Sequence, residues 1–288
     1  MEEKKYKSAL ILEGGAMRGL FTCGVMDVLM ENNITFDAGI GISAGAVFGC
    51  NYKSRQIGRP LRYNLKYCKD KRYCSFRSLR KTGDIYGVDF CYRELPRELD
   101  IFDVETYKNN PMKFFVGTTN VDTCECDIIE CPNGDDIDME YFRASASIPV
   151  LSRVVEIDGK RYFDGGITNP VPYRYMMDNG YNRNVIILTQ PKGFRKKLIN
   201  HRFIIKHSLK EMPKLRDLIF DMHNLYNRQM NEIDEIEKSG ISLVIRPPRS
   251  LHIGTSEKSR KKLQEVYNLG REEALKRLDE IKEFLNIN

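Results

Sequence analysis

Residues 8–19 read Ser-Ala-Leu-Ile-Leu-Glu-Gly-Gly-Ala-Met-Arg-Gly, and residues 36–45 read Phe-Asp-Ala-Gly-Ile-Gly-Ile-Ser-Ala-Gly. Each stretch begins with a short apolar run, which is typical of a buried strand, and continues into a turn that contains glycine. A segment with apolar residues at helical spacing follows each turn, at residues 19–31 and 44–52. This strand–helix–strand–helix order predicts a parallel sheet with right-handed crossovers.

The second turn holds a serine in the pentapeptide Gly41-Ile42-Ser43-Ala44-Gly45. Gly41 and Gly45 let the backbone turn sharply between strand and helix, so the Ser43 hydroxyl projects clear of its neighbours. A hydroxyl exposed in this way can attack an acyl carbon. Ser43 is therefore the candidate nucleophile.

A serine nucleophile needs a base, and Asp164 is a better candidate for this base than any histidine of the chain. Asp164 ends a predicted hairpin arm, and Gly165 and Gly166 behind it allow a close approach of the backbone. Because a free aspartate is a weak base, burial would have to raise the pKa of Asp164 toward neutrality. A Ser-His-Asp triad stays open, because its base could be any of the four histidines, His201, His207, His223 and His252.

The first turn is the candidate oxyanion site. A strand that runs into a glycine-rich turn and then a helix presents backbone N–H groups to an oxyanion or a phosphate. A dinucleotide-binding turn is the competing interpretation, but its Gly-x-Gly-x-x-Gly fingerprint would need glycine at position 16, which is alanine. The candidate oxyanion or substrate-binding residues are Gly14, Gly15, Ala16, Arg18 and Gly19.

Length and composition fit one large α/β domain or two small ones, since the chain has 288 residues of which 41% are hydrophobic. No run approaches the roughly 18 consecutive apolar residues that a membrane-spanning helix needs. The charged N-terminus, residues 1–5, does not resemble a secretory signal. We expect a soluble, cytoplasmic protein, and leave open a peripheral contact with a membrane.

The cysteines offer no complete metal site. Cys124, Cys126 and Cys131 form the only cluster and lack a fourth ligand at metal spacing. We expect neither a metal ion nor a cofactor.

The charge is unevenly distributed. Residues 53–81 hold eleven Lys and Arg and a single acid, Asp70, although the net charge of the chain is only +6. Such asymmetry indicates an anionic partner, namely a phosphate-bearing lipid, a membrane surface or nucleic acid, unless the stretch is simply a solvated face. We predict that residues 53–81 form a surface insertion or cap over the site, whose tyrosines face anionic head groups.

The remaining pattern predicts a sheet that is completed late in the chain. Strands are expected at 113–117, 127–130, 184–189 and 241–245, together with a hairpin over 154–163 that turns at Asp158-Gly159. Past residue 210 the chain is expected to be helical, with packing stripes at Leu215, Leu218, Ile219, Met222 and Leu225 and at Leu263, Val266, Leu275, Leu278, Ile281 and Leu285. We expect a core over 1–190 and a helical extension over 191–288 that packs on it, as one structural domain.

Three segments together resemble the motifs of the patatin-like phospholipases: 13–19, 41–45 and 164–166, in the family's order. The run Arg143-Ala144-Ser145-Ala146-Ser147-Ile148-Pro149 is similar to the family's Ala/Ser-rich segment ahead of the aspartate. The resemblance covers about residues 8 to 190, and the motifs are most similar to those of the family's bacterial branch. One departure is Ala16, where many members have glycine.

The resemblance implies a three-layer α/β/α sandwich with a mostly parallel central sheet and a helical C-terminal extension. It implies a Ser43–Asp164 dyad without a catalytic histidine, oxyanion donors in the backbone of Gly15 and Ala16, and support of that loop by Arg18.

Two functions from different classes follow as hypotheses. The first is a lipid acyl hydrolase of phospholipase A type, which cleaves esters of lipids or phospholipids through an acyl-enzyme. The second is a protein that binds an anionic membrane or nucleic acid on a hydrolase scaffold, with residues 53–81 as its working surface. The three hydrolase segments favour the first, so nucleic acid is not the expected partner, and nothing indicates the oligomeric state.

Overall fold

The core of the protein is a mixed sheet of eight strands, seen in a computed structural model that describes residues 6–200 and 202–287. The strand order is β5-β6-β3-β2-β1-β7-β8, and β4 pairs with β3. Five strands are mutually parallel: β1 (Lys7–Leu12), β2 (Ala38–Ile42), β3 (Lys113–Asn120), β7 (Tyr181–Ile187) and β8 (Ser242–Ile245). Antiparallel pairing adds β4 (Cys126–Glu130), β5 (Val155–Ile157) and β6 (Lys160–Asp164).

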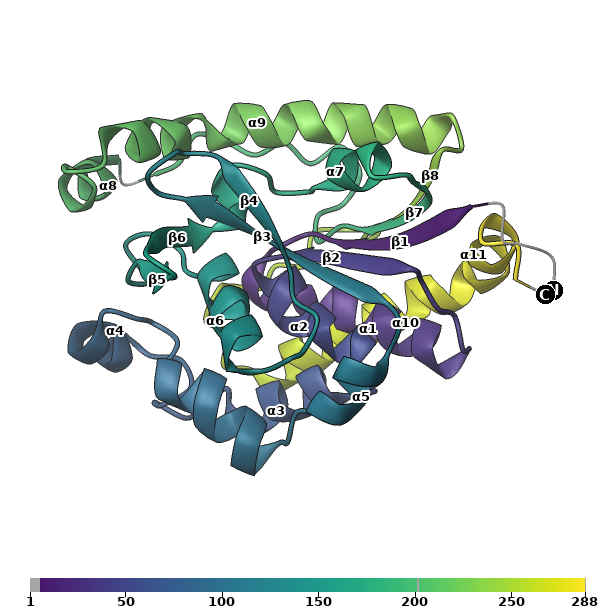
Figure 1. The fold of residues 1–288 in the computed structure, drawn as a ribbon, viewed down its shortest axis with the longest axis horizontal. Helices are drawn as coiled ribbons and strands as arrows, with labels where there is room; N and C mark the ends of the chain where they lie inside the picture. The colour runs from purple at the N-terminus through teal and green to yellow at the C-terminus, as the bar shows by residue number, and fades with distance from the viewer. Residues whose placement is uncertain (1–5, 201, 288) are drawn as a thin grey trace.

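Helices cover both faces of this sheet (Figure 1). On one face lie α1 (Gly19–Glu31), α2 (Ala44–Lys53) and α10 (Arg260–Lys276), and on the other lie α7 (Tyr173–Asp178) and α9 (Pro213–Lys238). Successive side chains along a strand therefore face the two helical layers in turn. Leu10 and Leu12 of β1 pack in the hydrophobic cluster on the face of α1, α2 and α10, whereas Ala9 and Ile11 pack in the cluster on the face of α7 and α9. The sheet is thus the middle layer of an α/β/α sandwich.

The other helical segments lie around these layers and at their ends. They are α3 (Arg59–Tyr67), α4 (Phe76–Thr82), α5 (Val104–Asn109), α6 (Asp136–Ser145), α8 (Arg202–Ser208), α11 (Leu278–Phe284), the short turns η1 (Ala16–Arg18) and η3 (Gly165–Ile167), and the wide-turn helix η2 (Phe90–Leu99). No helix of the described residues is long and apolar enough to cross a membrane.

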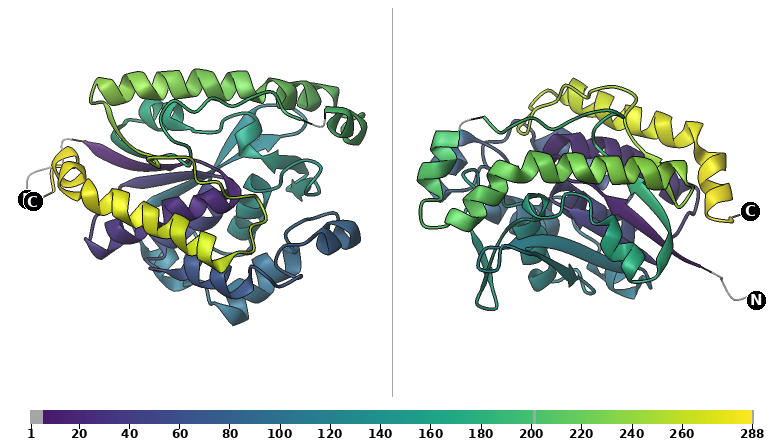
Figure 2. Two further views of the ribbon diagram at one scale, coloured as in Figure 1. Left: turned by 180° about the vertical axis from the view of Figure 1, so that it is seen from behind. Right: turned by 90° about the horizontal axis from the view of Figure 1, so that it is seen from above.

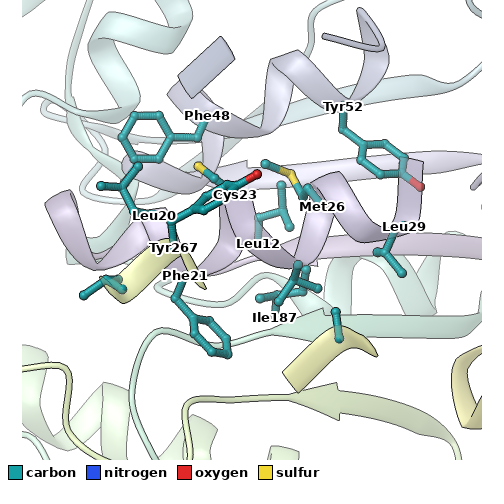
Figure 3. Packing of buried hydrophobic residues seen from close by; sticks show 14 of the residues in the cluster. Leu12, Leu20, Phe21, Cys23, Met26, Leu29, Phe48, Tyr52, Ile187 and Tyr267 are labelled. Atoms are coloured by element: carbon teal, nitrogen blue, oxygen red, sulfur yellow. The ribbon is translucent and has the colours of Figure 1, made fainter. Parts of the chain in front are cut away.

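The chain beyond residue 190 completes the sheet and one helical layer. β8 pairs in parallel with β7, and α10 packs along α1. The two helices approach closely at glycines, since a Cβ at Gly24 would lie 2.1 Å from the Tyr267 oxygen and one at Gly270 2.0 Å from the Phe21 oxygen. Figure 3 shows Tyr267 among the α1 side chains of this core.

Most of the predicted elements are present, with shifted ends. The hairpin turns where predicted, and Asp158 (φ 50°) and Gly159 (φ 73°) both have the left-handed backbone that a type I′ turn requires. The predicted strand over 36–42 begins at Ala38, and that over 184–189 begins earlier, at Tyr181. In the C-terminal stripes Leu275 is wrongly assigned to the core. It is 52% exposed, because the neighbouring Ala274 takes the buried position on α10.

The prediction that the tyrosines of residues 53–81 face head groups is wrong. Tyr63, Tyr67 and Tyr73 are buried in the same cluster as α1 and α2, where their rings make edge contacts with neighbouring aromatic rings. The alternation of cations and aromatic residues in the sequence did not reveal this burial, because the tyrosines lie on the inner side of the segment and most of the cations on the outer side.

Part of the positive charge of this segment is also neutralised by acids that follow it in the chain. Arg62 pairs with Asp100 at 2.7 Å, and Arg72 pairs with Glu94 at 2.9 Å. Arg59 is itself buried against Asp100. The outward cations that remain on this segment include Arg77, Arg80 and Lys81 of α4.

Candidate active site

Ser43 occupies a strained turn between β2 and α2. Its backbone angles are φ 54° and ψ −121°, a conformation that a residue with a side chain rarely adopts. The turn is tight enough to require glycine on both sides: a Cβ at Gly41 would lie 2.3 Å from the Gly45 oxygen, and one at Gly45 2.3 Å from the Leu12 oxygen. This is the geometry of a nucleophile elbow.

The register of β3 explains why Asp164 lies beside this serine. Gly117 of β3 is aligned with Ile42, the residue before Ser43, and the next residue, Thr118, is aligned with Asp164. Consecutive positions of one central strand therefore set the two side chains next to each other. Gly165 packs directly on β3, since a Cβ there would lie 2.2 Å from the Gly117 oxygen.

Asp164 is buried and held by several hydrogen bonds. Its Oδ1 accepts the Gly166 N–H at 2.8 Å, and its carbonyl oxygen accepts the Thr119 hydroxyl at 2.8 Å. Burial raises the pKa of Asp164 to about 6, although a hydrogen bond from the Ser43 hydroxyl, the Gly166 N–H and the charge of Lys196 each act to lower it. A carboxylate with this pKa can accept a proton near neutral pH.

The Ala/Ser-rich segment fixes both residues from behind. Ser145 Oγ accepts the Ser43 N–H at 2.9 Å and donates to the Gly117 carbonyl at 2.7 Å. Two residues on, the Ser147 carbonyl accepts the Asp164 N–H at 2.9 Å. One short segment thereby holds the backbone of Ser43 and of Asp164 in a fixed relation.

Replacement of Ser145 by alanine should therefore damage both stability and activity. The buried Ser43 N–H would lose its acceptor, which costs about 1–3 kcal/mol of unfolding free energy, and the elbow would loosen, so we expect kcat to fall about tenfold. Ser147→Ala is the matched control. It removes only the hydroxyl bond to the Arg143 carbonyl and keeps the backbone carbonyl that holds Asp164. Equal losses in denaturant titrations and kcat for both variants would contradict this role.

The first glycine-rich turn lies against the elbow. A Cβ at Gly14 would lie 2.9 Å from Ser43 Cβ, and one at Gly15 2.6 Å from Thr189 Oγ1. Ala16 takes a glycine-like φ of 49°, so the turn accepts alanine in a left-handed conformation. Within the described residues, neither Gly15 nor Ala16 donates its N–H to an acceptor. Both groups are free to bind an anion beside Ser43.

The two remaining candidates of this turn have different surroundings. Arg18 contributes to the same pocket, and its buried Nε has no hydrogen-bond partner within the part of the chain that the structure describes. Gly19 lies away from the pocket and is a packing position, since a Cβ there would lie 2.9 Å from the Phe48 ring.

Glu13 is a residue to which sequence reasoning gave no role. Its carboxylate accepts the Thr189 N–H and, at 2.9 Å, the Tyr226 hydroxyl. Burial raises the pKa of Glu13, although these hydrogen bonds and Arg18 act against the rise. Glu13 thus ties the turn to the end of β7 and to α9. An acid placed directly after a buried strand was the available signal, whereas nothing marked Tyr226.

Two hollows meet at Ser43 and Ala16. The first has a volume of about 290 Å³ and is lined by Asp164, Gly14, Gly15, Gly166, Arg18 and Lys196 among others. The second, of about 110 Å³, lies between α2, α6 and η2, and its wall is largely apolar, with Val47, Phe48, Leu95, Phe102 and Phe142. The serine is therefore at the junction of a charged compartment and an apolar one.

The described histidines do not complete a triad. His207, His223 and His252 line neither hollow, and His201 lies outside the described residues. Among the residues that the structure describes, no group of three or more His, Cys, Asp or Glu is placed to hold a metal ion.

Comparisons with known proteins agree with this geometry. Residues 10–177 match the model of the patatin-like phospholipase family, and residues 212–286 match a model described as a domain of unknown function, DUF6363. The chain is 26% identical to the uncharacterized protein YjjU of Escherichia coli, over 91% of this chain and 74% of YjjU. It is 26% identical to the probable lipid hydrolase 463L of Invertebrate iridescent virus 6, over 58% of this chain and 62% of that protein.

More distant relatives share a shorter region. The lysophospholipase NTE1 of Meyerozyma guilliermondii is 24% identical over 59% of this chain, which spans only 12% of that protein. Among solved structures, VipD of Legionella pneumophila matches with a TM-score of 0.48 and 13% identity, over 96% of this chain and 67% of that chain. The family match covers more than half of the chain and agrees with the α/β/α fold described above. The chain belongs to the patatin-like phospholipase family.

Proposed function

We propose that this protein is a phospholipase A-type carboxylic ester hydrolase in which Ser43 carries the acyl group and Asp164 moves the proton. The observation that carries the proposal is the content of one pocket. It holds a serine on a strained turn, a buried carboxylate whose pKa is raised to about 6, and two N–H groups without an acceptor among the described residues.

The acylation step follows from these positions. Ser43 Oγ attacks the ester carbonyl carbon while its proton passes to the Asp164 carboxylate. The carbonyl oxygen becomes an oxyanion, which accepts hydrogen bonds from the Gly15 and Ala16 N–H groups. When the tetrahedral intermediate collapses, the C–O bond to the alcohol breaks, and the leaving alkoxide takes the proton from Asp164.

Deacylation repeats the sequence with water as the nucleophile. Asp164 accepts a proton from a water molecule as its oxygen attacks the acyl carbon, and the same N–H groups bind the second oxyanion. The bond to Ser43 Oγ then breaks, Ser43 recovers its proton from Asp164, and the fatty acid leaves. No further proton carrier is required, which fits the position of the described histidines outside both hollows.

The two hollows support a lipid with a polar head as the substrate. The apolar hollow beside Ser43 suits an acyl chain, because burial of each methylene contributes about 0.8 kcal/mol. The other hollow contains Arg18 and Lys196. Burial lowers the pKa of Lys196, and Glu13 and Asp164 act against this shift. A phosphate in this hollow would face both cations.

Covalent labelling tests the proposal directly. A fluorophosphonate should modify the protein at a single residue, and peptide mapping should identify that residue as Ser43. The reaction depends on an activated hydroxyl and an oxyanion site together, so a protein that only binds membranes or nucleic acid on the same scaffold would not react. Labelling of another serine, or none, would contradict the mechanism.

A further inference from the structure

Exposed apolar side chains gather beside the charged hollow. Four of the twelve exposed large hydrophobic residues of the described chain lie close together in sequence: Leu198, Ile199, Phe203 and Ile204. Phe203 is 82% exposed, although burial of a phenylalanine stabilises a protein strongly. A contiguous group of this kind on a soluble protein commonly marks a surface that contacts a partner.

These side chains are not needed for the packing of their own helix. α8 is anchored by Ile205 and Leu209, which are buried against Phe163 and Ile167. Phe203 and Ile204 of the same helix remain exposed. Because Phe163 and Ile167 flank Asp164 in the sequence, α8 rests on the segment that carries the proposed base.

The segment of chain that carries the apolar group is rich in positive charge. From residue 179 to residue 210 the chain contains no Asp or Glu. Lys197, Arg202, Lys206 and Lys210 are exposed next to the apolar residues. Lys210 contacts Glu211 at 3.5 Å, and within the described residues the other three form no ion pair. An apolar group beside exposed cations, three of which form no ion pair within the described residues, complements the acyl and phosphate layers of an anionic bilayer.

A second group of the same composition lies at the same end of the molecule. Figure 1 shows α8 and α4 at one end, on opposite sides of the central layer, with α11 at the other end, and Figure 2 agrees in both views. Phe76 of α4 is 75% exposed, and the exposed cations Arg77, Arg80 and Lys81 follow it on the same helix. α4 buries none of its own side chains.

The entrance to the catalytic pocket belongs to this end of the molecule. Ile199 and Lys196 line the charged hollow together with Ser43 and Asp164. Lys196 is fixed to α9, since its N–H donates to the Asn227 side chain at 2.8 Å and its carbonyl accepts from it at 3.0 Å. The exposed apolar group thus continues directly into the pocket.

We propose that Leu198, Ile199, Phe203 and Ile204, with the cations of α8, form a docking surface for an anionic lipid bilayer, and that Phe76 of α4 makes a second, weaker contact. Docking sets the pocket mouth against the bilayer, so a lipid passes from the membrane to Ser43 without crossing water. The purpose of the docking rests on the proposed hydrolase function, but the docking itself can be measured without catalysis.

The binding test uses full-length Ser43→Ala protein, so that hydrolysis does not alter the vesicles. In co-sedimentation it should bind vesicles rich in phosphatidylglycerol more strongly than pure phosphatidylcholine vesicles, with a steep loss at high salt. Phe203→Glu with Ile204→Glu should lower the partition coefficient at least about tenfold, and Phe76→Glu about threefold. Leu275→Glu is the matched control, an exposed leucine on α10 whose change should have no effect.

A second set of variants separates charge from apolar contact. Lys197→Gln with Lys206→Gln keeps the apolar residues and should lower binding to phosphatidylglycerol vesicles about fivefold per cation, while weak binding to phosphatidylcholine stays unchanged. Equal vesicle binding by the Phe203/Ile204 variant and its parent would overturn the proposal. An equal loss of vesicle binding in the Leu275→Glu control would also overturn it, as would the absence of binding to any vesicle.

Activity then distinguishes this inference from the function on which it rests. In the protein with Ser43 intact, Phe203→Glu with Ile204→Glu should leave hydrolysis of a water-soluble short-chain ester unchanged and lower hydrolysis of vesicle lipid about tenfold. Vesicle binding without any esterase activity would refute the hydrolase and keep the docking surface. Esterase activity without vesicle binding would keep the hydrolase and refute the docking surface.

Discussion

Replacement of Ser43 by alanine is expected to lower kcat/KM for a soluble p-nitrophenyl ester by about 10⁴-fold or more, which leaves only the slow reaction that binding and the oxyanion donors support. The loss should be this large because the elbow presents the Ser43 hydroxyl beside Asp164 and the free N–H groups, in a position that the backbone sets. The measurement is steady-state kinetics on the purified variant.

Folding must be shown to survive the same change. The Ser43 N–H keeps its bond to Ser145, and the glycines that shape the turn are untouched, so the thermal midpoint should stay within about 3 °C of the parent. A variant that melts normally and retains parental turnover would eliminate Ser43 as the nucleophile. A variant that unfolds would make the loss of activity uninformative, and fluorophosphonate mapping on the parent would then decide.

Local patterns predicted the parts of this fold that depend on a few adjacent residues. Short segments determine the Gly41–Gly45 turn, the type I′ turn at Asp158-Gly159 and the alternation of strands and helices, because φ/ψ limits and periodicity act over a few residues. The family match confirms the resemblance drawn from the three motifs.

The contacts that were missed depend on register and on distant partners. The alignment of Thr118 with Asp164 is set by how β6 pairs with β3, and the sequence of β3 carries no mark of it. The hydrogen bond between Glu13 and Tyr226 joins residues that are 213 positions apart in the chain. The hydroxyl of Ser145 acts through the backbone of Ser43, a contact that the Ala/Ser-rich composition did not reveal.

The basic segment shows why composition alone misplaced the membrane-facing residues. Tyr63 and Phe76 both lie among cations, yet the first is buried and the second is exposed. The difference comes from packing: Tyr63 faces the core shared with α1 and α2, while α4 projects from the fold with no buried side chain. Periodicity over a nine-residue helix such as α3 is too short to distinguish an inner tyrosine from an outer one.

Asp164→Asn is expected to remove activity and to stabilise the protein, a combination that a misfolded variant would not show. The amide cannot take the proton of Ser43, so kcat/KM should fall by about 10³-fold or more. The parent should show a kcat/KM that rises tenfold per pH unit below a pKa of about 6 and is level above it, because Asp164 must be deprotonated to act as a base. In the variant this inflection should be absent.

The stability effect follows from the sign of the same pKa shift. Burial raises the pKa of Asp164 from 3.8 to about 6, so between these values the folded state holds a proton that the unfolded state has released. The parent therefore loses stability as the pH rises through this window, by about 2 to 3 kcal/mol in all, and the neutral asparagine avoids the loss. Urea titrations at pH 4 and pH 8 should show the variant and its parent nearly equal at pH 4 and the variant more stable at pH 8. A variant less stable than the parent at pH 8, or a parent whose kcat/KM does not change between pH 5 and pH 7, would show that Asp164 is not the buried base on which the mechanism depends.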